Sequence, residues 1–146
     1  MRKRIIHLII AFIICSCAFL PACFVTSCDR RRMTEFYSND SNYEVIVGKI
    51  TYSNLTYDGE RFIWLESEER TYSLSIVSAS EMYLNEKGVT LEVGEELFSI
   101  TTSTETWWNG WVFPVVAITR IADNEELLDF DTGKANLLYW IQYKLH

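Results

Sequence analysis

The side chains that most often carry out catalysis are sparse in this sequence. Histidine occurs only at His7, inside an apolar stretch, and at His146. A serine or cysteine nucleophile of the common kind needs an imidazole within hydrogen-bond reach, and a protein zinc site is built mainly from Cys and His. We therefore predict no catalytic residue, no metal site and no cofactor.

Carboxylates are the one class of potentially catalytic side chain that is clustered. Two carboxylates that converge on a substrate can hydrolyse a glycosidic bond. Each acidic group falls at a predicted turn, where such side chains are usually solvated. A hydrolase that uses a carboxylate pair is therefore the alternative to a non-enzymatic protein. The groups are Glu66, Glu68 and Glu69; Glu95 and Glu96; and Asp123, Glu125 and Glu126.

Three tryptophans, Trp107, Trp108 and Trp111, lie within five residues around Asn109-Gly110. Asn-Gly predicts a tight turn. Two interpretations are open for the rings: they close one end of a small domain as part of its core, or they are exposed. Exposed indoles stack on sugars, bind other proteins or enter the headgroup layer of a membrane. The three tryptophans are therefore the candidate ligand or partner contact.

The four cysteines all lie in or beside an N-terminal apolar segment, which leaves residues 29–146 without a thiol. Residues 2–4 are basic, residues 5–25 are almost entirely apolar, and small or polar residues follow. That order is the layout of a secretory signal. The 21 residues from Ile5 to Val25 also satisfy the length of about 20 that spans a bilayer. An uncleaved single-pass membrane helix with an extracellular β domain is the alternative.

Val25-Thr26-Ser27-Cys28 resembles a bacterial lipoprotein signal, with an aliphatic residue and two small residues before the cysteine. The resemblance implies cleavage before Cys28, acylation of Cys28, and attachment to the extracytoplasmic face of the cell membrane. Leu20-Pro21-Ala22-Cys23 is a weaker second match, so that Cys23 is the other candidate for the processed cysteine.

The charge of the polar part bears on its partners. Beyond Val25 the chain has ten basic and twenty acidic residues, a formal net charge of −10. Nucleic acids are bound largely by neutralising phosphates with Lys and Arg. We therefore expect no nucleic acid partner, and instead a membrane contacted through the lipid, with an envelope protein or a glycan as a further partner.

The chain divides into a signal or membrane segment (residues 1–27), an anchor and polar linker (28–42) and a β-rich domain (43–146). Alternating apolar residues predict strands. Ile46, Gly48, Ile50 and Tyr52 share one face, and Tyr72, Leu74 and Ile76 are predicted to point inward. Asp58-Gly59 predicts a type I′ turn. Ser78 and Glu81 have the spacing of a capping box for a short helix that Gly88 ends. The predicted strands are residues 44–57, 61–66, 70–77, 97–102 and 112–121, with residues 127–130 as a candidate for a short further strand. Thr132 is predicted to cap a final helix that runs to Leu145.

Three strands, a helix and two more strands is an order similar to that of the OB-fold, a five-stranded barrel. The resemblance covers residues 45–121 and predicts a mainly β, OB-like barrel with one helix between strands 3 and 4 and a C-terminal helix. A small sandwich or a roll is the alternative. The resemblance also implies that the tryptophan cluster lies in a ligand-binding loop. The leading hypothesis is a membrane-anchored, non-enzymatic binding module.

Overall fold

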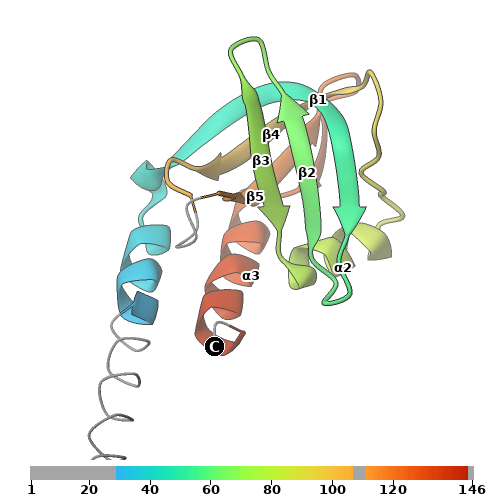
Figure 1. The fold of residues 1–146 in the computed structure, drawn as a ribbon. Helices are drawn as coiled ribbons and strands as arrows, with labels where there is room; N and C mark the ends of the chain where they lie inside the picture. Colours follow the sequence, from blue (N-terminus) through green and yellow to red (C-terminus); the bar gives the residue numbers. More distant parts are fainter. Residues whose placement is uncertain (1–28, 107–110, 145–146) are drawn as a thin grey trace, which may run out of the picture.

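The computed structural model describes residues 29–106 and 111–144. Residues 29–38 are helical. The elements that follow are η1 (Asp40–Asn42), β1 (Tyr43–Leu55), β2 (Arg61–Glu66), β3 (Thr71–Ile76), α2 (Ser78–Glu86), β4 (Leu97–Ser103), β5 (Phe113–Arg120), β6 (Glu125–Leu128) and α3 (Phe130–Tyr143) (Figure 1).

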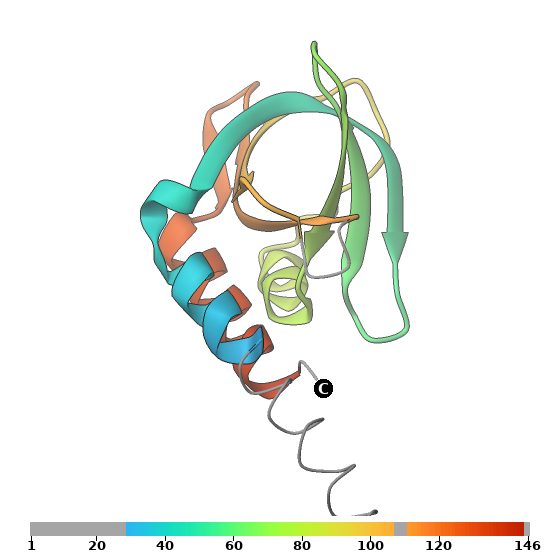
Figure 2. The same ribbon diagram turned by 60° about the vertical axis from the view of Figure 1, so that its left-hand side comes forward.

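The strands curl into a barrel. Their order in the sheet is β3-β2-β1-β4-β5-β6, and an additional parallel pairing of β3 with β5 closes the ring. The long β1 makes this possible because its first half pairs with β4 and its second half with β2. Figure 2 shows β1 arching over the barrel. The mainly β, barrel-like prediction is confirmed. On the outer edge of β5, β6 adds a sixth strand to the five of the predicted barrel, and it overlaps the candidate strand at residues 127–130.

Gly48 lies where β1 begins to run beside β2. A side-chain carbon built on Gly48 would be 2.3 Å from the carbonyl oxygen of Glu66, so any larger residue would push the strands apart. A bulge follows between Ile50 and Tyr52. Of the four residues predicted to share a face, Ile46, Gly48 and Ile50 are buried, whereas the bulge turns the Tyr52 ring outward to 40% exposure.

The apolar residues form two clusters. The first fills the barrel, where the predicted inward residues Tyr72, Leu74 and Ile76 are buried. The second lies between residues 29–38, α3 and β5, and its buried members are Met33, Tyr37, Val77, Val116, Leu137 and Ile141. The helical part of the chain therefore packs on the outside of the barrel.

The prediction of a polar linker over residues 28–42 is wrong for the part that is described. Met33 and Tyr37 are one helical turn apart, so they lie on the same face and are buried against α3. The Tyr43 hydroxyl donates to the Tyr37 carbonyl at 2.7 Å, and Lys134 on α3 pairs with Asp40. Three apolar or aromatic residues in an otherwise polar segment, Met33, Phe36 and Tyr37, were too few to show a period in the sequence.

Both predicted helix caps are wrong. Val77 is the N-cap of α2 and makes no side-chain cap bond, because Glu81 is drawn into a buried ion pair instead of the capping box. In α3 the cap is Asp129, whose carboxylate accepts from the Thr132 amide at 2.8 Å. That hydrogen bond lowers the pKa of Asp129.

The predicted glycine turns are confirmed in part. Gly88 has a φ of 72° just after the C-cap of α2, as expected of a glycine that ends a helix. At Asp58-Gly59 only the glycine has a positive φ, 81°. A type I′ turn needs a positive φ at both central residues, so the predicted turn type is wrong.

A buried ion pair joins β2 to α2. The guanidinium of Arg61 donates from Nε to both oxygens of Glu81, at 2.9 and 3.0 Å, and from Nη2 to Oε1 at 2.6 Å. Its Nη1 donates to Ser53 at 2.9 Å, and the Ser53 hydroxyl donates to the Leu91 carbonyl. The side chains of Arg61 and Glu81 are only 10% and 4% exposed.

Replacing Glu81 with Ala leaves the Arg61 guanidinium buried without its counter-charge. We expect Glu81→Ala to lower the free energy of unfolding by about 3–5 kcal/mol, measured by urea denaturation. The exposed Glu86→Ala on the same helix is the control, with a change within about 0.5 kcal/mol. A loss below about 1 kcal/mol for Glu81→Ala would show that water reaches the pair.

Two tyrosines make the docking of residues 29–38 sensitive to alkaline pH. Burial raises the pKa of Tyr37 to about 12, from an ordinary value of 10.0, and burial also raises the pKa of Tyr43. Below pH 10 both phenols are neutral in the folded and unfolded chains. Between pH 10 and 12 only the unfolded chain gains free energy by ionising, so we expect the free energy of unfolding to fall as pH rises through that window.

The double variant Tyr37→Phe, Tyr43→Phe has no phenol at either position, and its unfolding should therefore depend less on pH in the same window. Urea denaturation of both proteins from pH 8 to 12 measures the difference. Equal slopes would mean that other groups cause the alkaline loss.

Candidate functional site

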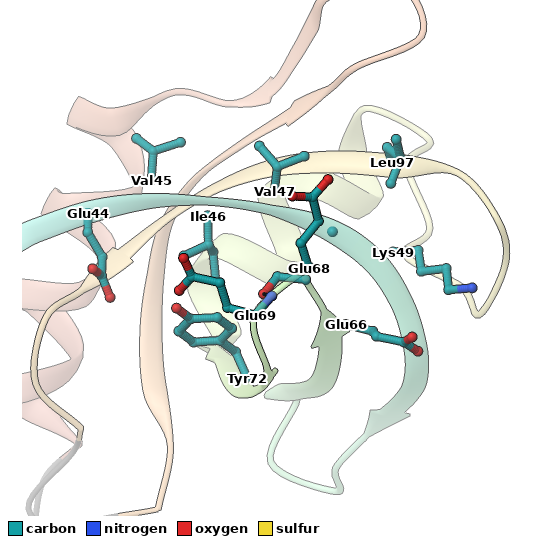
Figure 3. A pocket seen from close by; sticks show the side chains of 12 residues that line it. Glu44, Val45, Ile46, Val47, Lys49, Glu66, Glu68, Glu69, Tyr72 and Leu97 are labelled. Carbon is teal, nitrogen blue, oxygen red and sulfur yellow. Dashed lines mark hydrogen bonds between the residues drawn. The ribbon is translucent and has the colours of Figure 1, made fainter.

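A groove of about 720 Å³ opens where β1 leaves β2 (Figure 3). One wall is six consecutive residues of β1, Glu44 to Lys49, and the other is the end of β2 with the turn that leads into β3, residues 66–69. Tyr72 and Leu97 also line it. The groove exists because the ladder between β1 and β2 begins only at the Lys49–Glu66 pair.

The groove is acidic. Its lining includes the carboxylates Glu44, Glu66, Glu68 and Glu69 and one cation, Lys49. The Lys49 ammonium is 3.3 Å from a carboxylate oxygen of Glu95, outside the groove lining. Figure 3 shows the carboxylates spread along the groove from Glu44 at one end to Glu66 at the other. The groove therefore favours a positively charged ligand.

Arg70 lies next to the groove, against Tyr72, the buried aromatic residue that lines it. The guanidinium lies 4.2 Å from the centre of the Tyr72 ring and 5.7 Å from that of Phe113. Its pKa is raised first by a hydrogen bond with Tyr72, with smaller effects of the Glu44 and Glu69 charges. Arg70 thus partly offsets the acidic charge at one end of the groove.

A second surface carries exposed aromatic rings on the outside of the barrel. Tyr52 on β1 and Trp64 on β2 are cross-strand partners with ring centres 4.8 Å apart, and both are at least 40% exposed. Trp64 in turn pairs with Ser73 on β3. Tyr57, in the loop between β1 and β2, is fully exposed. These rings could stack on a flat ligand. They could not be identified from the sequence, because only the tertiary fold shows that they are exposed.

The structure places the predicted site residues unevenly. Trp111 is 77% exposed, whereas Trp107, Trp108 and Cys28 lie outside the described residues. Trp111 lies just before β5, whose first residue Phe113 pairs with Leu74 of β3. For Trp111, exposure rather than packing in the core is therefore the correct alternative.

Only some of the carboxylates that cluster in the sequence lie together in the structure. Glu66, Glu68 and Glu69 share the groove with Glu44. Glu96, Asp123 and Glu125 surround Arg120 instead, at 3.1, 3.2 and 2.6 Å. Within residues 29–106 and 111–144, no group of three or more His, Cys, Asp or Glu is arranged to hold a metal ion. In the same part of the chain no helix has the length and apolar character needed to cross a bilayer.

No protein-family model matches the chain, and no curated protein matches it. Among solved structures, it is similar to a chain in the crystal structure of the S. pombe Stn1–Ten1 complex. The TM-score is 0.43 and the sequence identity 13%, over 70% of this chain and 70% of that one. The likeness concerns the fold alone.

The strand order, the closing β3–β5 pair and the helix between β3 and β4 define an OB-like barrel. The expectation of no nucleic acid partner, made from the charge balance, is corrected by this topology, because OB-fold barrels include proteins that bind oligonucleotides as well as oligosaccharides. A net charge of −10 is therefore no ground for excluding a nucleic acid partner.

Trp111 and Trp140 provide a matched test of the exposed aromatic surface. Trp111→Ser should change the free energy of unfolding by less than about 1 kcal/mol, because the ring is largely solvated. Trp140→Ser should cost about 3 kcal/mol, because Trp140 packs on the second cluster and donates to Glu60 at 2.6 Å. Urea denaturation of both variants measures this. Equal losses of unfolding free energy would show that Trp111 packs in the core.

Proposed function

We propose that this protein is a membrane-anchored binding module, held by a lipid on Cys28 at the outer face of a bacterial cell membrane. The sequence of residues 25–28 supports the anchor. The OB-like barrel, with its groove and its exposed aromatic surface, supports the binding role. The ligand approaches from the extracytoplasmic side.

The observation that carries this proposal is the docking of residues 29–38. Asp29, the neighbour of Cys28, begins a helical segment that Met33 and Tyr37 fasten to α3. Figures 1 and 2 show the start of the helical segment 29–38 and the C-terminal end of α3 at one end of the molecule, with the turn between β2 and β3 at the other. An anchor at Cys28 would thus hold the barrel at a set height and orientation, with the groove away from the membrane.

The end of the molecule near residue 29 suits a headgroup layer. Arg31 and Arg32 are exposed there, and each basic residue near an anionic surface adds about 1 kcal/mol of attraction. Tyr139 and Tyr143, near the end of α3, are 54% and 55% exposed with ring centres 4.7 Å apart. Tyrosine is enriched at membrane interfaces. These side chains would steady the domain on the surface.

The alternative of a hydrolase is less well supported by the carboxylates of the groove. A general acid of the glycosidase type lies in an apolar pocket that keeps it protonated. Glu66, Glu68 and Glu69 are exposed instead. Their placement suits attraction of a cationic ligand better than proton transfer.

The intact mass of the protein extracted from bacterial membranes tests the anchor. We expect the mass of residues 28–146 plus acyl chains, and the mature protein should partition into detergent. Cys28→Ala should abolish acylation, while Cys23→Ala, the matched control, should leave it unchanged. The mass of the whole chain would instead show a membrane helix, and acylation that survives in Cys28→Ala but is lost in Cys23→Ala would move the anchor to Cys23.

A further inference from the structure

We propose that the acidic groove binds an extended, basic peptide segment that adds as a strand to the first half of β1. This deepens the proposed function, since it names the class of partner that the module takes. The occupant is a segment of a protein that carries several Lys or Arg residues at strand spacing.

The first half of β1 has a free edge on the side of the groove. Residues 43–49 pair with β4 on one side, and on the other side the ladder with β2 starts only at Lys49. Within the described residues, no strand therefore pairs along the groove side of residues 43–48. Backbone amides and carbonyls on such an edge are a template for another strand, and peptide recognition often uses this mode.

The second argument is the shape of the groove. Its β1 wall is six residues long, which corresponds to about 20 Å of strand. The opposite wall is the end of β2 and the turn that follows it, residues 66–69, so the groove runs beside this stretch of β1 (Figure 3). Val45 and Val47 on the β1 wall are 63% and 48% exposed. Their exposed methyl groups would be covered by the side chains of an added strand.

The third argument is charge. Four carboxylates line the groove against Lys49, which gives a formal net charge of −3. Carboxylates at both ends of the groove would meet basic side chains at several positions of one segment. A basic peptide is therefore a partner that the charge of the groove suits.

The probe is a fluorescein-labelled peptide of about seven residues, capped at both ends, in which lysine alternates with valine or threonine. Binding to the full chain in detergent is followed by fluorescence anisotropy. We expect saturable binding that weakens about tenfold or more in the double variant Glu68→Lys, Glu69→Lys. The matched control Glu86→Lys, Glu92→Lys makes the same change of charge at exposed positions outside the groove lining and should bind as the parent does.

Methylation of the peptide backbone separates strand addition from a merely electrostatic contact. Two further peptides carry N-methyl groups on alternate residues, one set on the odd and one on the even positions. In a strand, one set of amides faces the β1 edge and the other faces away. We therefore expect one methylated peptide to lose binding and the other to keep it.

Three results would overturn the proposal. They are equal binding by both methylated peptides, equal affinity of both charge-reversed variants, and no binding of the parent peptide. A single-stranded oligothymidine bound by the parent chain and bound more tightly by Glu68→Lys, Glu69→Lys would mark the groove as a nucleic acid site instead. The acylated mass and the peptide binding are measured separately, so failure of the peptide leaves the lipid anchor standing, and an unacylated chain that binds the peptide leaves the groove standing.

Discussion

The close approach of β1 to β2 at Gly48 is the constraint on which the barrel and its groove both depend. With a side-chain carbon only 2.3 Å from the Glu66 carbonyl oxygen, a larger residue at position 48 would separate the two strands at the start of their ladder. Because β1 pairs with β2 only from Lys49 onward, its first half pairs with β4 alone. In this way β1 pairs with two different strands along its length, and one edge of its first half has no strand beside it among the described residues.

A second close approach attaches the helical end of the molecule. A side-chain carbon on Gly133 would lie 1.9 Å from the Val116 carbonyl oxygen, so α3 can rest on β5 only with glycine at that position. Leu137 and Ile141, one and two turns further on, then cover the buried face that Met33 and Tyr37 also share. Through α3, the segment that follows Cys28 is connected to the same strand that closes the barrel against β3.

The sequence predicted the elements whose signal is local. Alternation located the strands, and Gly88 marked the end of α2. The sequence did not predict the features that depend on tertiary contacts. Glu81 has the spacing of a capping box but pairs with Arg61 instead, and Met33 and Tyr37 are buried only because α3 packs against them. The groove could not be predicted either, because Glu44 and Glu68 are far apart in the chain and meet only after β1 bends. Of the three tryptophans proposed as a contact, only Trp111 lies within the described chain, and its exposure decides between two alternatives that the sequence left open.

The two ends of the molecule have opposite chemistry, and the barrel separates them. Basic and tyrosine side chains gather near residue 29, and carboxylates gather around the turn between β2 and β3. With the proposed lipid on Cys28, an anionic membrane surface would attract the first end and repel the second. Charge alone would then orient the domain with its groove outward, and the packed helices would hold that orientation. A flexible tether would let the groove turn in any direction, whereas the burial of Met33 and Tyr37 against α3 would couple the proposed anchor to the direction in which the groove faces.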